Sequence, residues 1–231
     1  MSTLPGSAGF QPAPGTGLED GLRGWHSRGF LPHFDAGNVP QSITFRLAGS
    51  LPDSVRDAWR DELRLLPPGR ASAEERIRIE TFLNRGLGPC WLRDPRVGRM
   101  VEEALLHFDG ERYQLHAWMV MPNHVHVVMT PGRQVSVSKI VFSWKSFTAG
   151  RANALLGRSG AFWQADYFDR FIRDDDHFTT VVRYVERNPV VVGLCDQPEE
   201  SELSSARRRV EAGGGQDGRA PREADRVEDG G

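Results

Sequence analysis

The sequence contains few cysteines and no long apolar run. Two cysteines, Cys90 and Cys195, lie far apart in 231 residues, so neither a disulfide framework nor a CxxC zinc site is expected. That usage fits a reducing compartment. No apolar stretch approaches the ~18–20 residues of a membrane span, and the N-terminus lacks the basic start and apolar core of a signal peptide. We therefore expect a soluble, cytoplasmic protein that makes no membrane contact.

Large apolar residues are also scarce at both ends of the chain. Residues 1–24 are rich in Gly, Pro, Ser and Ala, and residues 197–231 are charged and rich in Gly. Such compositions bury too little apolar surface to fold, so we expect two disordered tails. A short helix around residues 206–212 is the one element expected in them. The folded domain is then confined to residues 25–196.

Alternation and helical periodicity divide this domain into strands and helices. Their expected order is a strand (40–47), three helices (54–66, 72–86 and 95–108), two strands (112–121 and 124–131), a helix (136–157), a strand (167–173) and a helix (174–188). Ser72 and Glu75 are expected to form a capping box at the start of the second helix. Asn188–Pro189 is expected to end the last helix.

This order predicts an α+β fold of the ferredoxin-like, split βαβ type. The first crossover is enlarged by extra helices, and one more helix follows the last strand. We expect an antiparallel-rich sheet with helices on one face. The other face would then be open to ligands.

The stretch from residue 121 to residue 129, "MPNHVHVVM", carries two histidines inside an apolar strand. Residues i and i+2 of a strand point to the same face, so His124 and His126 project side by side. Two interpretations remain open from the spacing alone. The pair is either part of a metal site or two polar residues on a solvated sheet face.

The last expected helix carries Tyr184 and Asn188, four residues apart. That spacing places a phenol and an amide on one face of the helix. Taken alone, such a pair is more typical of an ordinary helix surface than of a functional site.

The segment between Arg133 and Ala165 has positive residues and no acidic residue. Its five basic residues are Arg133, Lys139, Lys145, Arg151 and Arg158. A local basic surface of this kind suits phosphates, although each residue could equally belong to a solvated helix face. The interleaved Trp144 and Phe147 fit the helix core better than base stacking.

Three motifs in this order resemble one family. They are "AWMVMPNHVHVVMTP" from residue 117, "FWQADYFDRFIRD" from residue 162 and "YVERNPV" from residue 184. The sequence resembles the REP-associated tyrosine transposases, single-tyrosine members of the HUH endonuclease superfamily, over about residues 24–195. The segment after residue 194 lacks the tryptophan-containing stretch with which that family often continues.

The resemblance implies a transposase that cleaves and rejoins single-stranded DNA, usually folded into hairpin repeats. It implies that His124, His126 and Asn188 bind a divalent metal ion, and that Tyr184 attacks the phosphate. The products would be a 5′-phosphotyrosine link and a free 3′-OH. The family points to Mg²⁺ or Mn²⁺, and imidazole ligands favour Mn²⁺ of the two.

Among the three tyrosines, Tyr113 begins a strand and Tyr167 is expected to pack in the core, so Tyr184 is the preferred nucleophile. We expect a monomer rather than a dimer. Two other functions stay open. One is a DNA or RNA hairpin-binding protein with an idle tyrosine, and the other is a His-x-His metal-dependent hydrolase that uses water.

Overall fold

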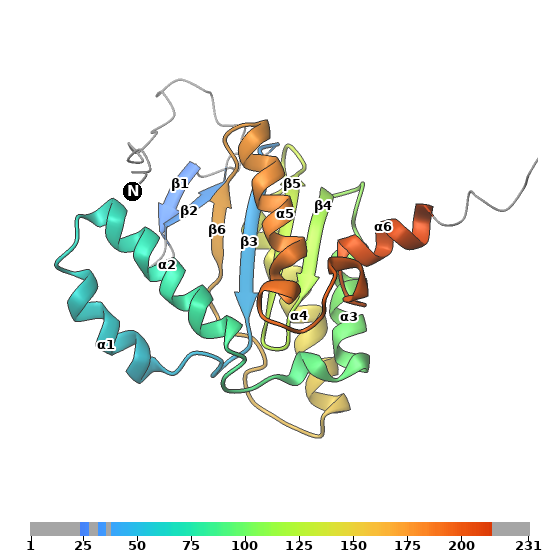
Figure 1. Cartoon of the computed structure of the whole chain (residues 1–231), viewed down its shortest axis with the longest axis horizontal. Helices are drawn as coiled ribbons and strands as arrows, with labels where there is room; N and C mark the ends of the chain where they lie inside the picture. The colour runs from blue at the N-terminus through green and yellow to red at the C-terminus, as the bar shows by residue number, and fades with distance from the viewer. Residues whose placement is uncertain (1–23, 28–31, 36–37, 214–231) are drawn as a thin grey trace, which may run out of the picture.

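The computed structural model describes residues 24–27, 32–35 and 38–213. Its centre is a four-stranded sheet in the order β4-β5-β3-β6. These strands are β3 (Gln41–Arg46), β4 (Tyr113–Val120), β5 (His124–Pro131) and β6 (Phe168–Phe171). Every neighbouring pair is antiparallel. The expected α+β class and ferredoxin-like strand order are confirmed (Figure 1).

Helices connect and flank these strands in the expected order. They are α1 (Asp53–Leu63), α2 (Pro68–Asn84), η1 (Trp91–Arg93), α3 (Pro95–Leu106), α4 (Val137–Leu155) and α5 (Asp175–Val191). Side chains cap three of them, because Asp94, Ser136 and Asp174 accept backbone N–H groups at the starts of α3, α4 and α5. An additional two-stranded antiparallel sheet, β1 (Gly24–Ser27) with β2 (Pro32–Asp35), was not expected.

One face of the central sheet carries the main core. Ile43 and Phe45 of β3 and Val125 and Val127 of β5 alternate onto this face, where they pack with Trp144 of α4. All five side chains are at most 2% exposed. The helices α3 and α4 cover this face, as the helical crossovers of this fold predict.

The opposite face is not free of helices, and this part of the fold prediction is wrong. Met119, Met121 and Val128 point to this face and pack against Val185 of α5. In Figure 1, α5 lies in front of the sheet and α4 behind it. The apolar stripe of α5 needs a partner surface, and the alternate residues of β4 and β5 provide it.

Two helix ends also differ from expectation. Helix α2 begins at Pro68, four residues before the expected cap at Ser72, because proline suits the first turn of a helix, where its missing N–H is not needed. Helix α5 continues through Asn188–Pro189 to Val191. The backbone N–H of Val192 donates to the Asn188 carbonyl at 3.2 Å, so helical bonding persists beyond the proline.

The segment after residue 197 is not disordered throughout. Residues 198–213 form η2 (Pro198–Glu200) and α6 (Ser205–Gly213), close to the short helix expected there. The N–H of Val120 donates to the Leu203 carbonyl at 3.1 Å, and the N–H of Trp118 donates to Ser205 Oγ at 3.2 Å. Because β4 is an edge strand, its free backbone groups need partners, and this segment supplies them.

The rest of both expected tails, residues 1–23 and 214–231, lies outside the described residues. Within the described part of the chain, no helix has both the length and the apolar character needed to cross a bilayer.

Candidate active site

The two histidines of β5 lie side by side on the sheet face that α5 covers. His124 and His126 are 0% and 2% exposed, and their Nε2 atoms are 2.9 Å apart. His124 Nδ1 lies 2.7 Å from Asn123 Oδ1, and His126 Nδ1 lies 2.9 Å from Thr44 Oγ1. Each ring is therefore held by its Nδ1 atom, and the two Nε2 atoms converge on one point.

The environment disfavours the protonated form of both rings. Burial lowers the pKa of His124 well below its usual range, and His126 lowers it further. Burial also lowers the pKa of His126, against an opposing effect of Glu80. The Asn123 amide donates to the Leu83 carbonyl at 3.1 Å, which turns its oxygen toward His124 and makes His124 Nδ1 the donor. His124 Nε2 then carries a lone pair, as metal ligation requires.

Helix α5 brings Tyr184 and Asn188 to this pair. Asn188 Nδ2 donates to Tyr184 Oη at 3.0 Å and lies 3.5 Å from His126 Nε2. The amide oxygen of Asn188 is buried and has no hydrogen-bond partner among the described residues. A buried oxygen without a donor is costly. Because the amide nitrogen faces His126, the amide has to flip to offer this oxygen to a cation beside the imidazoles.

The residues present fit a divalent metal ion. Two neutral imidazoles and one amide oxygen are common ligand types for such ions. The third candidate ligand here is an amide. In the part of the chain that the structure describes, there is no group of three or more His, Cys, Asp or Glu side chains that could hold a metal ion. Three protein ligands leave coordination positions for water and a phosphate oxygen.

Two residues of α2 contact the tyrosine, and the sequence reasoning missed both. Tyr184 Oη donates to Glu80 Oε1, and the Asn84 side chain is also hydrogen-bonded to Tyr184. Burial and Glu80 raise the pKa of Tyr184, while Asn188 and Asn84 lower it. Ser72, Arg76, Glu80 and Asn84 occur at intervals of four residues, a polar stripe that could have indicated a functional helix face.

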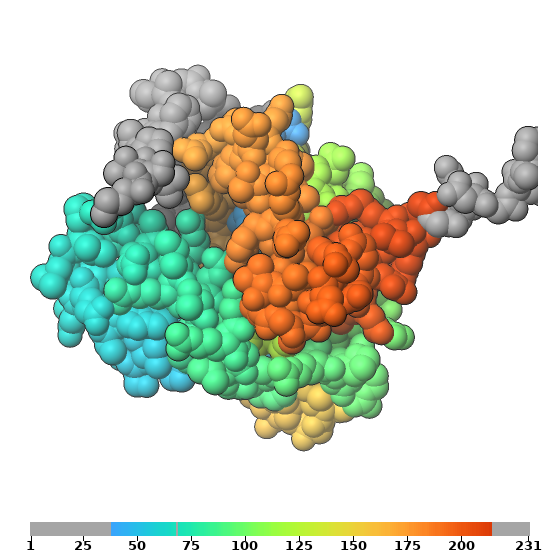
Figure 2. Space-filling view, in the orientation of Figure 1, coloured from blue at the N-terminus to red at the C-terminus, as the bar shows by residue number. Residues whose placement is uncertain are grey.

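A cleft of about 450 Å³ opens between α2, α5 and the sheet. Figure 2 shows α2 and α5 on the same side of the molecule. The cleft is lined by His124, His126, Tyr184 and Glu80 together with Thr44, Arg76, Asp169, Arg170 and His177. His124, His126 and Tyr184 thus line one cavity, with Tyr184 40% exposed, and the buried Asn188 contacts His126 and Tyr184.

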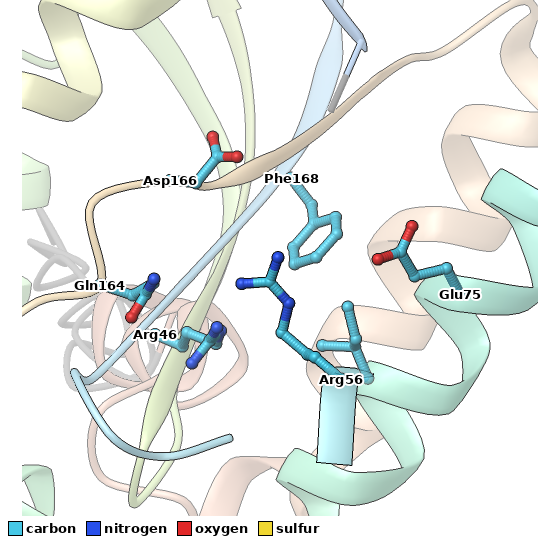
Figure 3. A pocket seen from close by; sticks show the side chains of 7 residues that line it. Arg46, Arg56, Glu75, Gln164, Asp166 and Phe168 are labelled. Carbon is cyan, nitrogen blue, oxygen red and sulfur yellow. The ribbon is translucent and has the colours of Figure 1, made fainter. Parts of the chain in front are cut away.

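A smaller pocket adjoins this cleft, and Ile79 and Phe168 line both. Arg46 and Arg56 contribute guanidinium groups to it (Figure 3). Arg46 is paired in register with His124 across β3 and β5. Burial, followed by Arg56, lowers the pKa of Arg46 to about 10, and nearby acidic groups offset this only in part. The largely buried guanidinium of Arg46 therefore lies on β3, the strand next to the one that carries the histidines.

The five basic residues expected to contact DNA do not line this cleft. They belong to α4 and its flanks, on the opposite side of the sheet. Lys145 Nζ donates to three carbonyls, those of Gln164, Ala165 and Asp166. The guanidinium carbon of Arg158 lies 3.5 Å from the ring centre of Trp91, and that of Arg151 lies 3.8 Å from the ring centre of Phe147.

Arg133 and Lys139 are exposed. The structure therefore brings together the four residues expected for metal binding and attack, and separates them from the five expected for DNA binding.

The other two tyrosines have structural contacts. Tyr113 is 3% exposed, donates to the Leu105 carbonyl at 2.6 Å and accepts from Trp144 Nε1 at 2.9 Å. Tyr167 is 8% exposed and belongs to the main core. Neither lines the cleft, so Tyr184 is the one tyrosine that does.

Comparison with known proteins agrees with this geometry. Residues 94–188 match the family model described as "Transposase IS200 like". A search of curated proteins found no match.

Two solved structures are similar at low identity. The first, a REP-associated tyrosine transposase bound to a REP hairpin, has a TM-score of 0.48 and 16% identity, with 81% of this chain and 86% of that chain covered. The second, a candidate transposase from Deinococcus radiodurans R1, has a TM-score of 0.29 and 15% identity, with coverages of 71% and 96%. The family match spans both histidines, the tyrosine and the asparagine, and over this segment the chain is similar to the IS200-like transposases.

Proposed function

We propose that this protein is a metal-dependent endonuclease and strand transferase that acts on single-stranded DNA through Tyr184. One observation carries the proposal. Two imidazole nitrogens and the hydroxyl of Tyr184 meet at a single cleft, and the buried amide of Asn188 contacts both His126 and Tyr184. That combination supplies a nucleophile and an electrophilic centre for phosphoryl transfer.

His124, His126 and Asn188 would hold the metal ion, Mg²⁺ or Mn²⁺. When bound, the ion polarises a phosphoryl oxygen and stabilises the charge that develops on it. Thr44 and Asn123 orient the two rings through their Nδ1 atoms, which is the usual role of groups behind a ligating histidine. The two imidazoles favour Mn²⁺ over Mg²⁺.

Tyr184 needs a proton acceptor, because its pKa is raised and free tyrosinate is scarce at neutral pH. The Glu80 carboxylate accepts its hydrogen bond and is placed to take that proton. As the Tyr184 oxygen bonds to phosphorus, the bond to the 3′-oxygen breaks and that oxygen leaves with the electron pair. It is protonated by solvent, into which Glu80 later releases its proton. The products are a 5′-phosphotyrosine and a free 3′-OH.

The test uses hairpin oligonucleotides taken from repeats that flank the gene, labelled at the 5′ or the 3′ end and incubated with Mn²⁺ or Mg²⁺. We expect a protein–DNA band that resists denaturation and carries the label on the 3′ side of the cut. Tyr184→Phe and His124→Ala should both lose the band. Tyr167→Phe, which removes a hydroxyl outside the cleft, should keep it.

The same experiment separates the two rival functions. Metal-dependent cleavage that survives in Tyr184→Phe would indicate a hydrolase that uses water. Hairpin binding with no cleavage and no covalent band would indicate a binding protein whose tyrosine is idle.

We also propose that the protein acts as a monomer. The edge of β4 is already paired with residues 203–205, which leaves that part of the edge closed to another strand. Sedimentation at micromolar concentration should give a single species of about 26 kDa. A dimer would contradict this part of the proposal.

A further inference from the structure

Three arginines and one histidine gather at one side of the catalytic cleft. Arg76 comes from α2, Arg170 from β6, Arg173 from the turn after β6 and His177 from the first turn of α5. Arg76, Arg170 and His177 line the same cleft as His126 and Tyr184. We call Arg76, Arg170 and Arg173 the arginine cluster.

The members of the arginine cluster lie close enough to repel one another. Burial lowers the pKa of Arg170, and Arg76 and Arg173 lower it further. The same arginines act on His177. Burial is the main cause that lowers the pKa of His177, the three arginines lower it further, and Asp174 has the opposite effect. The local potential at this side of the cleft is therefore positive, although the whole chain has a net charge of −2.

No described carboxylate forms a salt bridge with the arginine cluster, although Asp174 lies near it. Two carboxylates line the cleft as well, but Glu80 accepts the tyrosine hydroxyl. The other, Asp169, is not among the groups that offset the pKa of Arg170. Like charges held together without an acidic partner favour binding of an external anion.

We propose that the arginine cluster binds backbone phosphates of the single strand that enters the cleft. Guanidinium groups match phosphate geometry through paired N–H donors. The contacts would be independent of sequence, and would set the position of the strand relative to Tyr184. This inference rests on the proposed function for its ligand, and it names the surface along which the DNA lies. Arg76 is outside the matched family segment, in the enlarged crossover of this chain.

The test measures binding without cleavage. Tyr184→Phe protein is titrated into 5′-fluorescein-labelled (dT)20, and anisotropy is recorded over a range of NaCl concentrations. Arg76→Gln/Arg170→Gln is then made in the same background. Each lost phosphate contact should reduce the salt slope of log K by about 0.7, which corresponds to roughly fivefold weaker binding per arginine at 0.1 M salt.

A matched control separates the cluster from bulk charge. Arg133→Gln/Arg151→Gln removes the same charge from the α4 side of the sheet and should leave the slope and affinity unchanged. Arg173→Gln, at an exposed position, provides a second cluster variant that leaves the cleft wall intact, and it should lower the slope in the same direction. Thermal melting of every variant shows whether the fold is kept.

Two results would overturn the proposal. One is an unchanged slope in the cluster variants, and the other is an equal loss in the α4 control. Failure of the proposed function is distinguishable, because it would appear as no covalent band with Tyr184 intact, whatever the salt slope.

Discussion

The two faces of the central sheet are built from the same strands and are used in opposite ways. On β3 and β5, Ile43, Phe45 and Val127 face α3 and α4, while Thr44 and His126 face the cleft. Both sets include fully buried side chains. On the core face, apolar side chains pack against the helices. On the cleft face, buried polar side chains form hydrogen bonds, and the neighbouring Asn188 Oδ1 has no hydrogen-bond partner among the described residues.

This difference separates the buried side chains that stabilise the fold from those that do not. Burying apolar side chains on the core face stabilises the fold by roughly 1.5–3 kcal/mol for each large residue. Burying imidazole and amide groups on the other face is unfavourable unless every polar atom is paired. The two buried histidines and the unpaired amide oxygen are the groups that the proposed metal ion would satisfy.

The largest effect should come from the core face. Trp144 is 2% exposed, stacks 6.0 Å from the Phe45 ring and donates to Tyr113 Oη at 2.9 Å. Trp144→Ala leaves a cavity and an unpaired hydroxyl, so the free energy of unfolding should fall by about 3–5 kcal/mol. Urea denaturation measures this loss. Tyr184→Phe, on the cleft face, should melt close to the unmodified protein. Similar losses of stability in Trp144→Ala and Tyr184→Phe would contradict the proposed difference between the two faces.

A substitution on the cleft face should slow the formation of the covalent adduct without destabilising the fold. Glu80→Gln keeps an oxygen that can accept the Tyr184 hydroxyl but removes the basic carboxylate. The rate of covalent adduct formation should fall by about 10²–10⁴-fold, with no change in (dT)20 affinity. Rapid-quench sampling of the adduct gives the rate.

Glu75→Gln is the matched control for this change. Glu75 is on the same helix and lines the smaller pocket rather than the catalytic cleft. Its rate should stay within a few fold of the unmodified protein. If Glu80→Gln forms adduct at the full rate, the tyrosine proton goes to another acceptor.

The cleft face should also make the metal-free fold sensitive to acid. The pKa values of His124 and His126 are lowered in the folded state, whereas an unfolded histidine has a pKa of about 6.5. Below that value the unfolded chain binds more protons, so stability falls as pH decreases. Between pH 7.5 and pH 5 the loss should reach at most about 2 kcal/mol per histidine.

Urea denaturation with chelator present, repeated at several pH values, measures this dependence. His126→Gln removes one of the two titrating groups, so its stability should change less steeply with pH. Equal slopes in the two proteins would show that His126 has the same pKa in the folded and the unfolded state, contrary to the lowered pKa that burial gives it.

The parts of the site that follow from local periodicity could be predicted. The alternation of β5 places His124 beside His126, and helical spacing places Tyr184 beside Asn188. Glu80 is 104 residues from Tyr184, and no local pattern brings α2 across the cleft. Charge alone did not locate the five basic residues relative to the cleft, because a run of basic residues on α4 does not reveal which face of the sheet that helix covers.

The pairing of the C-terminal segment with β4 was not predicted, for a related reason. Residues 198–213 have little apolar content of their own, and their order comes from backbone groups of β4 that need partners. The unpaired edge of a sheet is a property of the whole fold and is not visible in the composition of the segment that covers it.

The smallest of these effects should come from Lys145, a residue whose charge suggested DNA binding. Burial lowers its pKa to about 8, and its Nζ donates to the carbonyls of residues 164–166 at 2.8–3.1 Å. Lys145→Gln cannot reproduce all three bonds, so stability should fall by about 1–3 kcal/mol. The salt slope for (dT)20 should stay unchanged. Thermal melting and anisotropy measure the two quantities. A stable Lys145→Gln protein with a lower salt slope would show that DNA reaches the α4 side of the sheet, and the comparison of the two faces would then have to be drawn differently.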